Sequence, residues 1–290
     1  MFKLLVLVSG TLWALPVGAQ DDLDPLRNPN VAVHVLEKKP FRDEGRAEVV
    51  LYPVVPQLNG EFTQHVGTAL SFVYHLQENF GLTLTPVYNW YARSSGFNRE
   101  LNNSVSGEAR PATSSLLDYG AHLGFEVAPL YGKFALYDGI LGRFSVVVHA
   151  GAGLAHTRHE LKEGNAFGPA TYGDTGIRLL MAVGAGFRVQ LGQRFTLRLE
   201  VNDLAYAARV DRVNGCSEGD LSTLVHQQGQ GGALSASAVS GSCKVSSFQG
   251  TDKNGYTRVS DLQTALDLTR DTASDVLNNL GLYAGFGFVF

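Results

Sequence analysis

The feature that most constrains the fold of this chain is an alternation of apolar and polar side chains with a period of two residues. Eight segments show it, and turn residues separate each segment from the next. They cover residues 46–55, 61–76, 79–92, 116–129, 143–157, 175–191, 194–209 and 278–290. Successive residues of a β-strand face opposite sides of a sheet, so each segment predicts a strand with one apolar and one polar face.

The connections between these segments differ in length in a regular way. Very short links join the second segment to the third and the sixth to the seventh, and PQLNG joins the first to the second. The fourth-to-fifth link, around LYGKFALYDGILG, is of moderate length, whereas residues 93–115, 158–174 and 210–277 form long polar connections. Membrane β-barrels have short periplasmic turns and longer external loops. With an even number of strands and both termini in the periplasm, the three long connections are external.

The fold class predicted from this pattern is all-β: an eight-stranded antiparallel transmembrane outer-membrane β-barrel with long external loops. Lipid offers no hydrogen bonds to the backbone, so a closed barrel is the form in which a sheet crosses a bilayer. The alternative is a soluble sandwich or a lipocalin-like barrel. Such a fold would alternate in the same way, but it requires neither long loops at one end nor a C-terminal Phe.

Composition excludes two further classes of protein. Charged residues make up 17% of the chain, below the roughly 25% of average soluble domains. Mean hydropathy is close to zero, and no stretch after the N-terminus has the 18 or so consecutive apolar residues of a membrane-spanning helix. The net charge of −4 gives no indication of nucleic-acid binding.

The N-terminus, MFKLLVLVSGTLWALPVGAQ, has the pattern of a secretory signal. Lys3 precedes an apolar stretch over residues 4–15, and small residues precede a cleavage position near Ala19. We therefore predict a signal peptide over 1–19, a periplasmic N-terminal segment over 20–45 and the barrel over 46–290. A buried first strand or a single membrane anchor is the alternative to export.

The periplasmic segment itself allows two interpretations. Its VAVHV stretch alternates, which would let it add a strand to a partner or cover the lumen from below. The alternative is a solvated linker.

The polar faces of the strands predict what occupies the lumen. Eight strands leave an interior just wide enough for side chains. The inward ionisable residues are Glu48, His65, His75, Asp118, His122, Glu126, His149, Arg178, Arg188, Arg198 and Glu200. The two-residue turn between the sixth and seventh segments places Arg188 opposite Arg198.

Buried charges need partners, and carboxylates of the same half can supply them. We predict a cluster of Glu48, Glu126, Arg188, Arg198 and Glu200 in the periplasmic half. Our hypothesis is that this cluster is a salt-bridged plug that closes the lumen. The alternative is a narrow charged constriction that passes ions.

The last strand ends in bulky apolar residues. Phe286, Phe288 and Phe290 share one face with Leu282. A terminal aromatic on such a strand resembles the signal by which the outer-membrane β-barrel assembly machinery recognises its clients. That machinery and outer-membrane lipid are therefore expected partners.

Cys216 and Cys243 are the two cysteines of the chain, and both lie in the long connection 210–277. The cell envelope permits disulfides, so we predict a bridge that shapes this Gly- and Ser-rich loop. Two free thiols are the alternative. Residues 259–277 are compatible with a helix or with an extension of the last hairpin.

One segment invites a reading as a metal or catalytic site. HTRHE contains His156, His159 and Glu160, but the spacing does not match a HExxH motif. Together with Asp174, the two histidines form the best candidate set for catalysis, and nothing in the sequence fixes a nucleophile beside them. We predict no catalytic residues, no metal and no cofactor.

Several stretches taken in order resemble a known family. AVHVLEKKPFRDEGRAEVVLYPVV, FTQHVGTALSFVYHLQENFGLTLTP, VAPLYGKFAL, AGAG and NNLGLYAGFGFVF resemble the outer-membrane β-barrel family of myxobacteria and their relatives. The resemblance covers about residues 31–210 and 278–290. Some members are subunits of the gliding-motility machinery of Myxococcus, which links an inner-membrane motor to surface adhesion sites. The resemblance implies a non-enzymatic subunit of a trans-envelope complex with other envelope proteins as partners, and a small porin-like channel is the alternative.

Overall fold

The structure is a computed structural model that describes most of the chain after residue 42. The described residues are 43–59, 63–96, 100, 115–136, 140–162, 164, 169–251, 257–270 and 276–290. The predicted signal peptide and most of the predicted periplasmic segment lie outside these residues.

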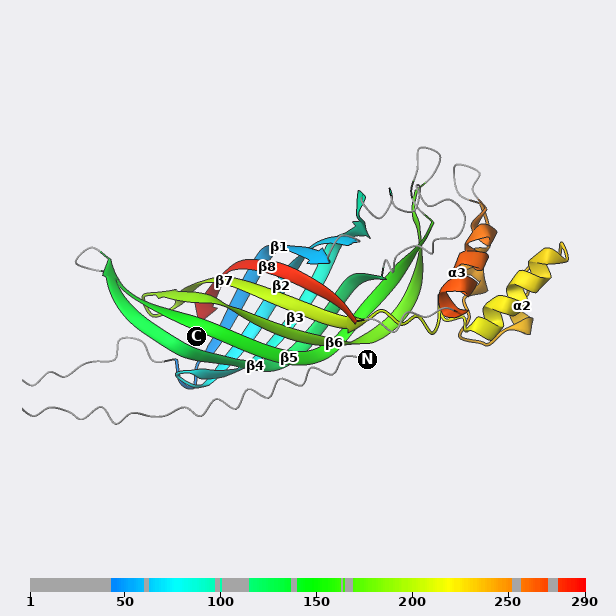
Figure 1. Cartoon of the computed structure of the whole chain (residues 1–290). Helices are drawn as coiled ribbons and strands as arrows, with labels where there is room; N and C mark the ends of the chain where they lie inside the picture. Colours follow the sequence, from blue (N-terminus) through cyan, green and yellow to red (C-terminus); the bar gives the residue numbers. More distant parts are fainter. Residues whose placement is uncertain are drawn as a thin grey trace, which may run out of the picture. The chain divides into compact units, whose positions relative to one another are not determined.

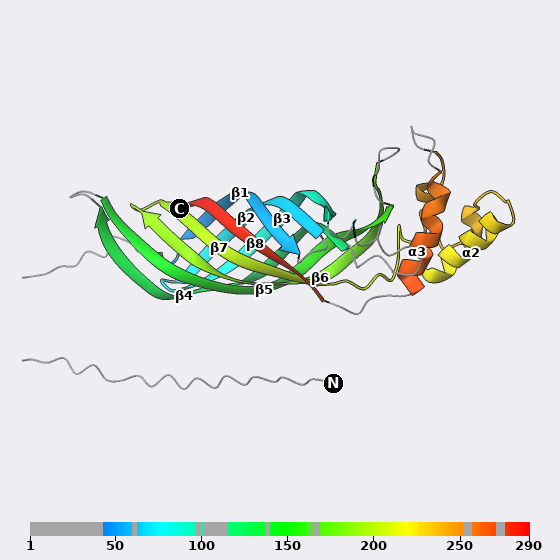
Figure 2. The ribbon, with the colours of Figure 1, turned by 45° about the horizontal axis from the view of Figure 1, so that its top comes forward.

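Eight antiparallel strands form one closed barrel (Figure 1), as predicted. The strands are β1 (Ala47–Asn59), β2 (Thr63–Gln77), β3 (Phe80–Ser94), β4 (Ser115–Leu136), β5 (Ile140–Lys162), β6 (Thr171–Leu191), β7 (Phe195–Ala207) and β8 (Val276–Val289). Each strand pairs with its neighbour in sequence, and β1 closes the ring against β8. Figure 2 shows this closure, with β8 between β1 and β7.

The register of the strands sets the width of the barrel. A path of directly paired residues runs once around the ring: Val289, Glu48, Val73, Thr83, Gly124, Gly151, Ala182, Leu204 and Asn279. The path starts and ends on β8, and its ends are 289 − 279 = 10 residues apart. A staggered eight-stranded barrel of this kind has strands tilted by roughly 35–45° around a lumen that side chains can fill.

The outer wall is apolar and the interior is polar, the reverse of a soluble barrel. Leu123, Ile177 and Leu179 are 65%, 67% and 63% exposed. Along β7, Phe195, Leu197, Leu199 and Val201 are exposed, and the alternating residues Thr196, Arg198, Glu200 and Asn202 are buried. Aromatic side chains also stand exposed toward the two ends of the wall: Tyr88, Trp90 and Tyr119 at one end, and Tyr131, Phe195 and Phe290 at the other. An apolar band flanked by aromatic residues is the lipid-facing surface of an outer-membrane barrel, so the soluble alternative is wrong.

In the part of the chain that the structure describes, no helix is both long enough and apolar enough to cross a membrane.

Two hairpins are longer than predicted. β4 and β5 continue pairing to Leu136 and Ile140, so most of the link around LYGKFALYDGILG is strand. At the opposite end, β5 and β6 pair as far as Lys162 and Thr171, inside the predicted loop 158–174. β1 likewise extends through Asn59, into PQLNG. The prediction ended each strand where large apolar residues stopped alternating, but the backbone ladder does not depend on that alternation.

The long connection 210–277 contains a small helical unit. Its elements are α2 (Glu218–Gly229), η3 (Ala236–Ala238), η4 (Val245–Phe248), η5 (Arg258–Ser260) and α3 (Asp261–Arg270), coloured yellow to orange in Figure 1. Of residues 259–277, which the sequence left open, those up to Arg270 are helical in η5 and α3, whereas Val276 and Leu277 already belong to β8. Leu221, Phe248 and Leu262 are completely buried in a core that this connection forms together with Leu161 of β5, which makes the connection a folded module.

Candidate functional site

Arg198 lies at the centre of the buried charge cluster. Its Nη2 donates to Glu48 Oε2 at 2.9 Å, and its Nη1 donates to Glu200 Oε1 at 3.1 Å. Both terminal nitrogens also donate to the Glu126 carboxylate. Arg198 is 4% exposed and Glu48 is completely buried. One guanidinium therefore joins carboxylates from β1, β4 and β7 across the lumen.

Arg188 completes the set of five predicted residues. It is paired in register with Arg198, as the two-residue turn predicts. Its Nε lies 3.1 Å from Glu48 Oε2, the oxygen that also accepts from Arg198. The carboxylate of Glu48 thus sits between two arginines and offsets their repulsion, since charged pairs out of water persist only with well-aligned opposite charges.

Three further residues join this cluster, and the sequence prediction placed none of them in it. Asp43 Oδ2 accepts from Arg188 Nη1 at 2.7 Å and from Arg143 Nη1 at 3.3 Å. His75 Nε2 lies 3.0 Å from Glu48 Oε2. The inward orientation of Arg143 could have been predicted, because Arg143 lies an even number of residues from the inward-facing His149 on the same strand. Asp43 precedes the first strand in the segment read as periplasmic, so no periodicity indicated that its side chain enters the barrel.

A second layer of large apolar side chains fills the lumen on the side of the helical unit. It comprises Val50, Tyr52, Val55, Ala69, Val87, Leu117, Ala155, Leu180, Ala182, Leu204, Tyr206 and Tyr283, none of them more than 4% exposed. The Tyr52 hydroxyl donates to Glu200 Oε1 at 3.0 Å and joins this layer to the charge cluster. The Tyr206 hydroxyl donates across to the Ser115 carbonyl at 2.9 Å.

A small polar cavity remains beside the two layers. Its lining includes Tyr52, Glu126, Arg198 and Glu200, and the space open to the centre of a water molecule is about 10 Å³. A cavity of that size holds about one water. Around this cavity, the side chains of the two layers therefore fill the lumen almost completely.

The two histidines of HTRHE have different surroundings. His156 Nε2 lies 3.0 Å from Asp174 Oδ1, and its Nδ1 lies 3.4 Å from Asp118 Oδ2. Both ring nitrogens thus face carboxylates. His159 is completely buried, and the Glu160 carboxylate accepts from the Ser94 hydroxyl.

Within the described ranges, no three His, Cys, Asp or Glu side chains gather with the geometry of a metal site.

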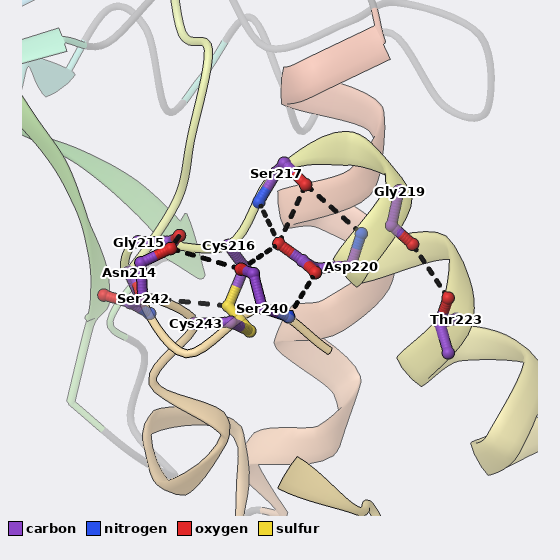
Figure 3. Close-up of a disulfide and its surroundings, with 10 residues drawn as sticks. All are labelled: Asn214, Gly215, Cys216, Ser217, Gly219, Asp220, Thr223, Ser240, Ser242 and Cys243. Atoms are coloured by element: carbon purple, nitrogen blue, oxygen red, sulfur yellow. Dashed lines mark hydrogen bonds between the residues drawn. A yellow bond between two sulfur atoms is a disulfide. The ribbon is translucent and has the colours of Figure 1, made fainter. Parts of the chain in front are cut away.

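The predicted disulfide between Cys216 and Cys243 is confirmed. Figure 3 shows the bridge at the start of α2, next to the Asn214–Gly215 turn. Both residues of that turn have positive φ, 52° at Asn214 and 77° at Gly215. A side chain at Gly215 would collide with the Ser242 carbonyl oxygen, so glycine allows the two strands of chain to approach at the bridge.

Asp220 holds the same region together through its carboxylate. Ser217 caps α2 and exchanges hydrogen bonds with Asp220 in a capping box. From the other side of the disulfide, the Ser240 backbone N–H donates to Oδ1 at 2.8 Å and the Ser240 hydroxyl donates to Oδ2 at 2.7 Å (Figure 3). One carboxylate therefore joins α2 to the segment that carries Cys243.

Replacing Asp220 with alanine is expected to destabilise the helical unit by about 1–2 kcal/mol at neutral pH, the usual cost of a lost cap. Slight burial raises the pKa of Asp220, but hydrogen bonds from Ser240 and Ser217 outweigh it and hold the pKa well below its ordinary 3.8. Because folding lowers this pKa, the stabilisation is present above pH 3.8 and is lost as the pH falls further. The difference between wild type and variant should therefore shrink in acid.

Hydrogen exchange of α2, measured from pH 7 to pH 3, tests this prediction. Asp267→Ala is the matched control, since Asp267 in α3 accepts one bond from Gln263 and should matter by a few tenths of a kcal/mol. A difference that persists unchanged at pH 3 would contradict the prediction.

The helical unit is attached to the barrel through β6. The Asn214 N–H donates to the Asp174 carbonyl at 2.7 Å, and the Asp174 N–H donates to Asn214 Oδ1 at 3.0 Å. Val213 packs on Gly173, where any side chain would clash with it. Leu161 of β5 contributes to the core of the unit.

Comparisons with known proteins find similarity among solved structures. No protein-family model matches the chain, and no curated protein matches it. Among solved structures, it is similar to Ail, the attachment invasion locus protein of Yersinia pestis, crystallised with the heparin analogue sucrose octasulfate. The identity is 11% and the TM-score is 0.33, over 85% of this chain and 99% of Ail.

Proposed function

We propose that this protein is a structural subunit of a trans-envelope complex, anchored in the outer membrane by a barrel that conducts nothing. The observation that carries the proposal is the packed lumen. Arg198 and its three carboxylates occupy one layer and large apolar side chains occupy the next. A transport protein needs a water-filled path, whereas an anchor needs only a stable wall.

Folded extensions on the barrel support the same proposal. The helical unit projects from β6, and its exposed surface is polar: among the described residues of 208–270, no large apolar side chain is exposed. Such a module suits contact with other proteins or the cell surface in water. The gliding-motility machinery is the specific complex that the family resemblance favours, with the predicted periplasmic segment and short turns facing the inner parts of that machinery.

The purified, refolded protein in a planar bilayer is expected to show no steady single-channel conductance. Buried salt bridges would have to break to open a path, and their desolvated partners make that costly. A reproducible, ion-selective conductance of the wild-type protein would favour the small porin-like channel, with Arg188, Arg198 and Glu200 as its selectivity ring.

Co-purification from crosslinked envelopes tests the subunit role directly. The tagged protein should retain a defined set of envelope proteins, whereas a stand-alone channel should not. Loss of gliding in a strain lacking the protein would assign the complex.

A further inference from the structure

β4 runs past its neighbour on one side. Its last direct partner on β3 is Val127, opposite Phe80, and one further bond joins the Ala128 N–H to the Asn79 carbonyl. From residue 130 to residue 136, β4 pairs only with β5 among the described residues. Figures 1 and 2 both show the β4–β5 hairpin projecting past the other strands. The outer edge of β4 therefore presents backbone N–H and C=O groups without a strand partner in the described chain.

This hairpin is firmly built. The Phe144 ring lies over Gly132 and the Phe134 ring lies over Gly142, where any added side chain would collide with the ring. The Arg143 guanidinium lies 5.0 Å from the centre of the Tyr131 ring and is ion-paired with Asp43 in the buried cluster. Cross-strand aromatic contacts and a tie to the cluster hold the edge in a fixed, extended shape.

A protruding edge on β6 is covered, unlike the edge of β4. β6 extends beyond β7 over residues 171–179, and there Asn214 bonds to Asp174 while Val213 covers Gly173. At the edge of β4, the described chain supplies no such cover. It supplies Pro129 and the exposed Lys133, two features that keep an edge strand from pairing indiscriminately.

We infer that the free edge of β4 over residues 130–136 binds an extended strand of a second envelope protein. The inference rests on the proposed subunit role and names the kind of partner. A row of backbone donors and acceptors is matched only by another extended chain. Leu130 and Phe134 share one face, in register with Val146 and Gly142, and call for apolar residues at alternate positions of the partner.

Lys133 determines the charge of that partner. It lies on the face that also carries Tyr131 and Arg143, so a carboxylate of the added strand opposite Lys133 would be favourable. A second copy of this chain would instead bring a lysine-bearing edge to the same edge, and like charges on adjoining strands are destabilising.

A photo-crosslinking aromatic amino acid in place of Tyr131, which is exposed on the same face as Lys133 and leaves that lysine intact, tests the inference in cells. The crosslinked peptide is expected to come from one envelope protein and to combine alternating apolar residues with an Asp or Glu near the attachment point. The same amino acid at Leu123, which is 65% exposed on the lipid-facing part of β4, is the matched control and should not capture that peptide. The Lys133→Glu variant should reduce co-purification of the partner more than about fivefold, and an acidic-to-Lys change in the captured peptide should restore it.

Two results would overturn the inference. One is a crosslink from position 131 only to this chain, whether a second copy or its own N-terminal segment. The other is Lys133→Glu protein that folds, as judged by its unchanged gel mobility without heating, and retains its partners in full. If the wild-type protein retains partners and the Lys133→Glu variant retains them equally well, the proposed role of the β4 edge is wrong and the subunit role stands. If the wild type retains none, the subunit role itself fails.

Discussion

The Arg198→Met variant is expected to lose about 3–5 kcal/mol of barrel stability, the cost of breaking a buried ion pair by removing one partner. Arg198 is shared by Glu48, Glu126 and Glu200, all at most 5% exposed. Methionine fills a similar volume but leaves these carboxylates with less compensating charge. Arg188 still pairs with Glu48, so Glu126 and Glu200 carry most of the penalty.

Denaturant unfolding in detergent, followed by Trp90 fluorescence, measures this loss. Trp90 is exposed on the lipid-facing wall and is the only tryptophan after the predicted cleavage site. Arg209→Met is the matched control. Its ion pair with Asp211 is solvent-exposed, and such pairs contribute about 1 kcal/mol or less.

Removing charge from the carboxylates of the cluster tests its stabilising role independently. A double variant, Glu126→Gln with Glu200→Gln, should also lower the temperature at which the barrel loses its folded gel mobility. Unchanged stability in both this variant and Arg198→Met would remove the salt-bridged plug as an account of the lumen.

The strand arrangement was predictable because a period of two fixes which face each residue occupies. That is why the register of Arg188 with Arg198 and the gathering of Glu48, Glu126 and Glu200 followed from parity and one short turn. The alternation of residues shows which face of the strand each one occupies, however, and not how far along the barrel axis it lies. The apolar layer around Tyr52, Tyr206 and Tyr283 therefore escaped notice, although its members alternate like the charges.

Features outside the strands were harder to predict. Asp43 reaches the cluster from a polar stretch with no period, and its position depends on Arg143 and Arg188, which are far away in sequence. For α2, the sequence carries a recognisable signal in the Ser217–Asp220 capping box ahead of the helix. The Gly- and Ser-rich sequence around that box has no helical period of its own and favours a loop.

Removing the disulfide by Cys216→Ala and Cys243→Ala is expected to destabilise the helical unit by about 3 kcal/mol in the chain-entropy account, because the bridge closes a separation of 27 residues. Cys216 is also completely buried in the core of the unit, next to Val213 and Leu221. The barrel should be unaffected, since its ladders and its charge cluster contain neither cysteine. The expected result is therefore a folded barrel that carries an unfolded connection between β7 and β8.

Limited proteolysis of intact cells or proteoliposomes separates the two parts. Cleavage within residues 208–270 should accelerate strongly in the variant, while the unheated gel mobility of the barrel stays that of wild type. Ser246→Ala, an exposed change in the same unit, is the control and should leave cleavage unchanged. If the variant resists protease as wild type does, the core around Leu221, Phe248 and Leu262 holds the unit without the bridge. Were the barrel to unfold together with the unit, the attachment through Asn214 and Asp174 would couple the two parts more tightly than their separate cores imply.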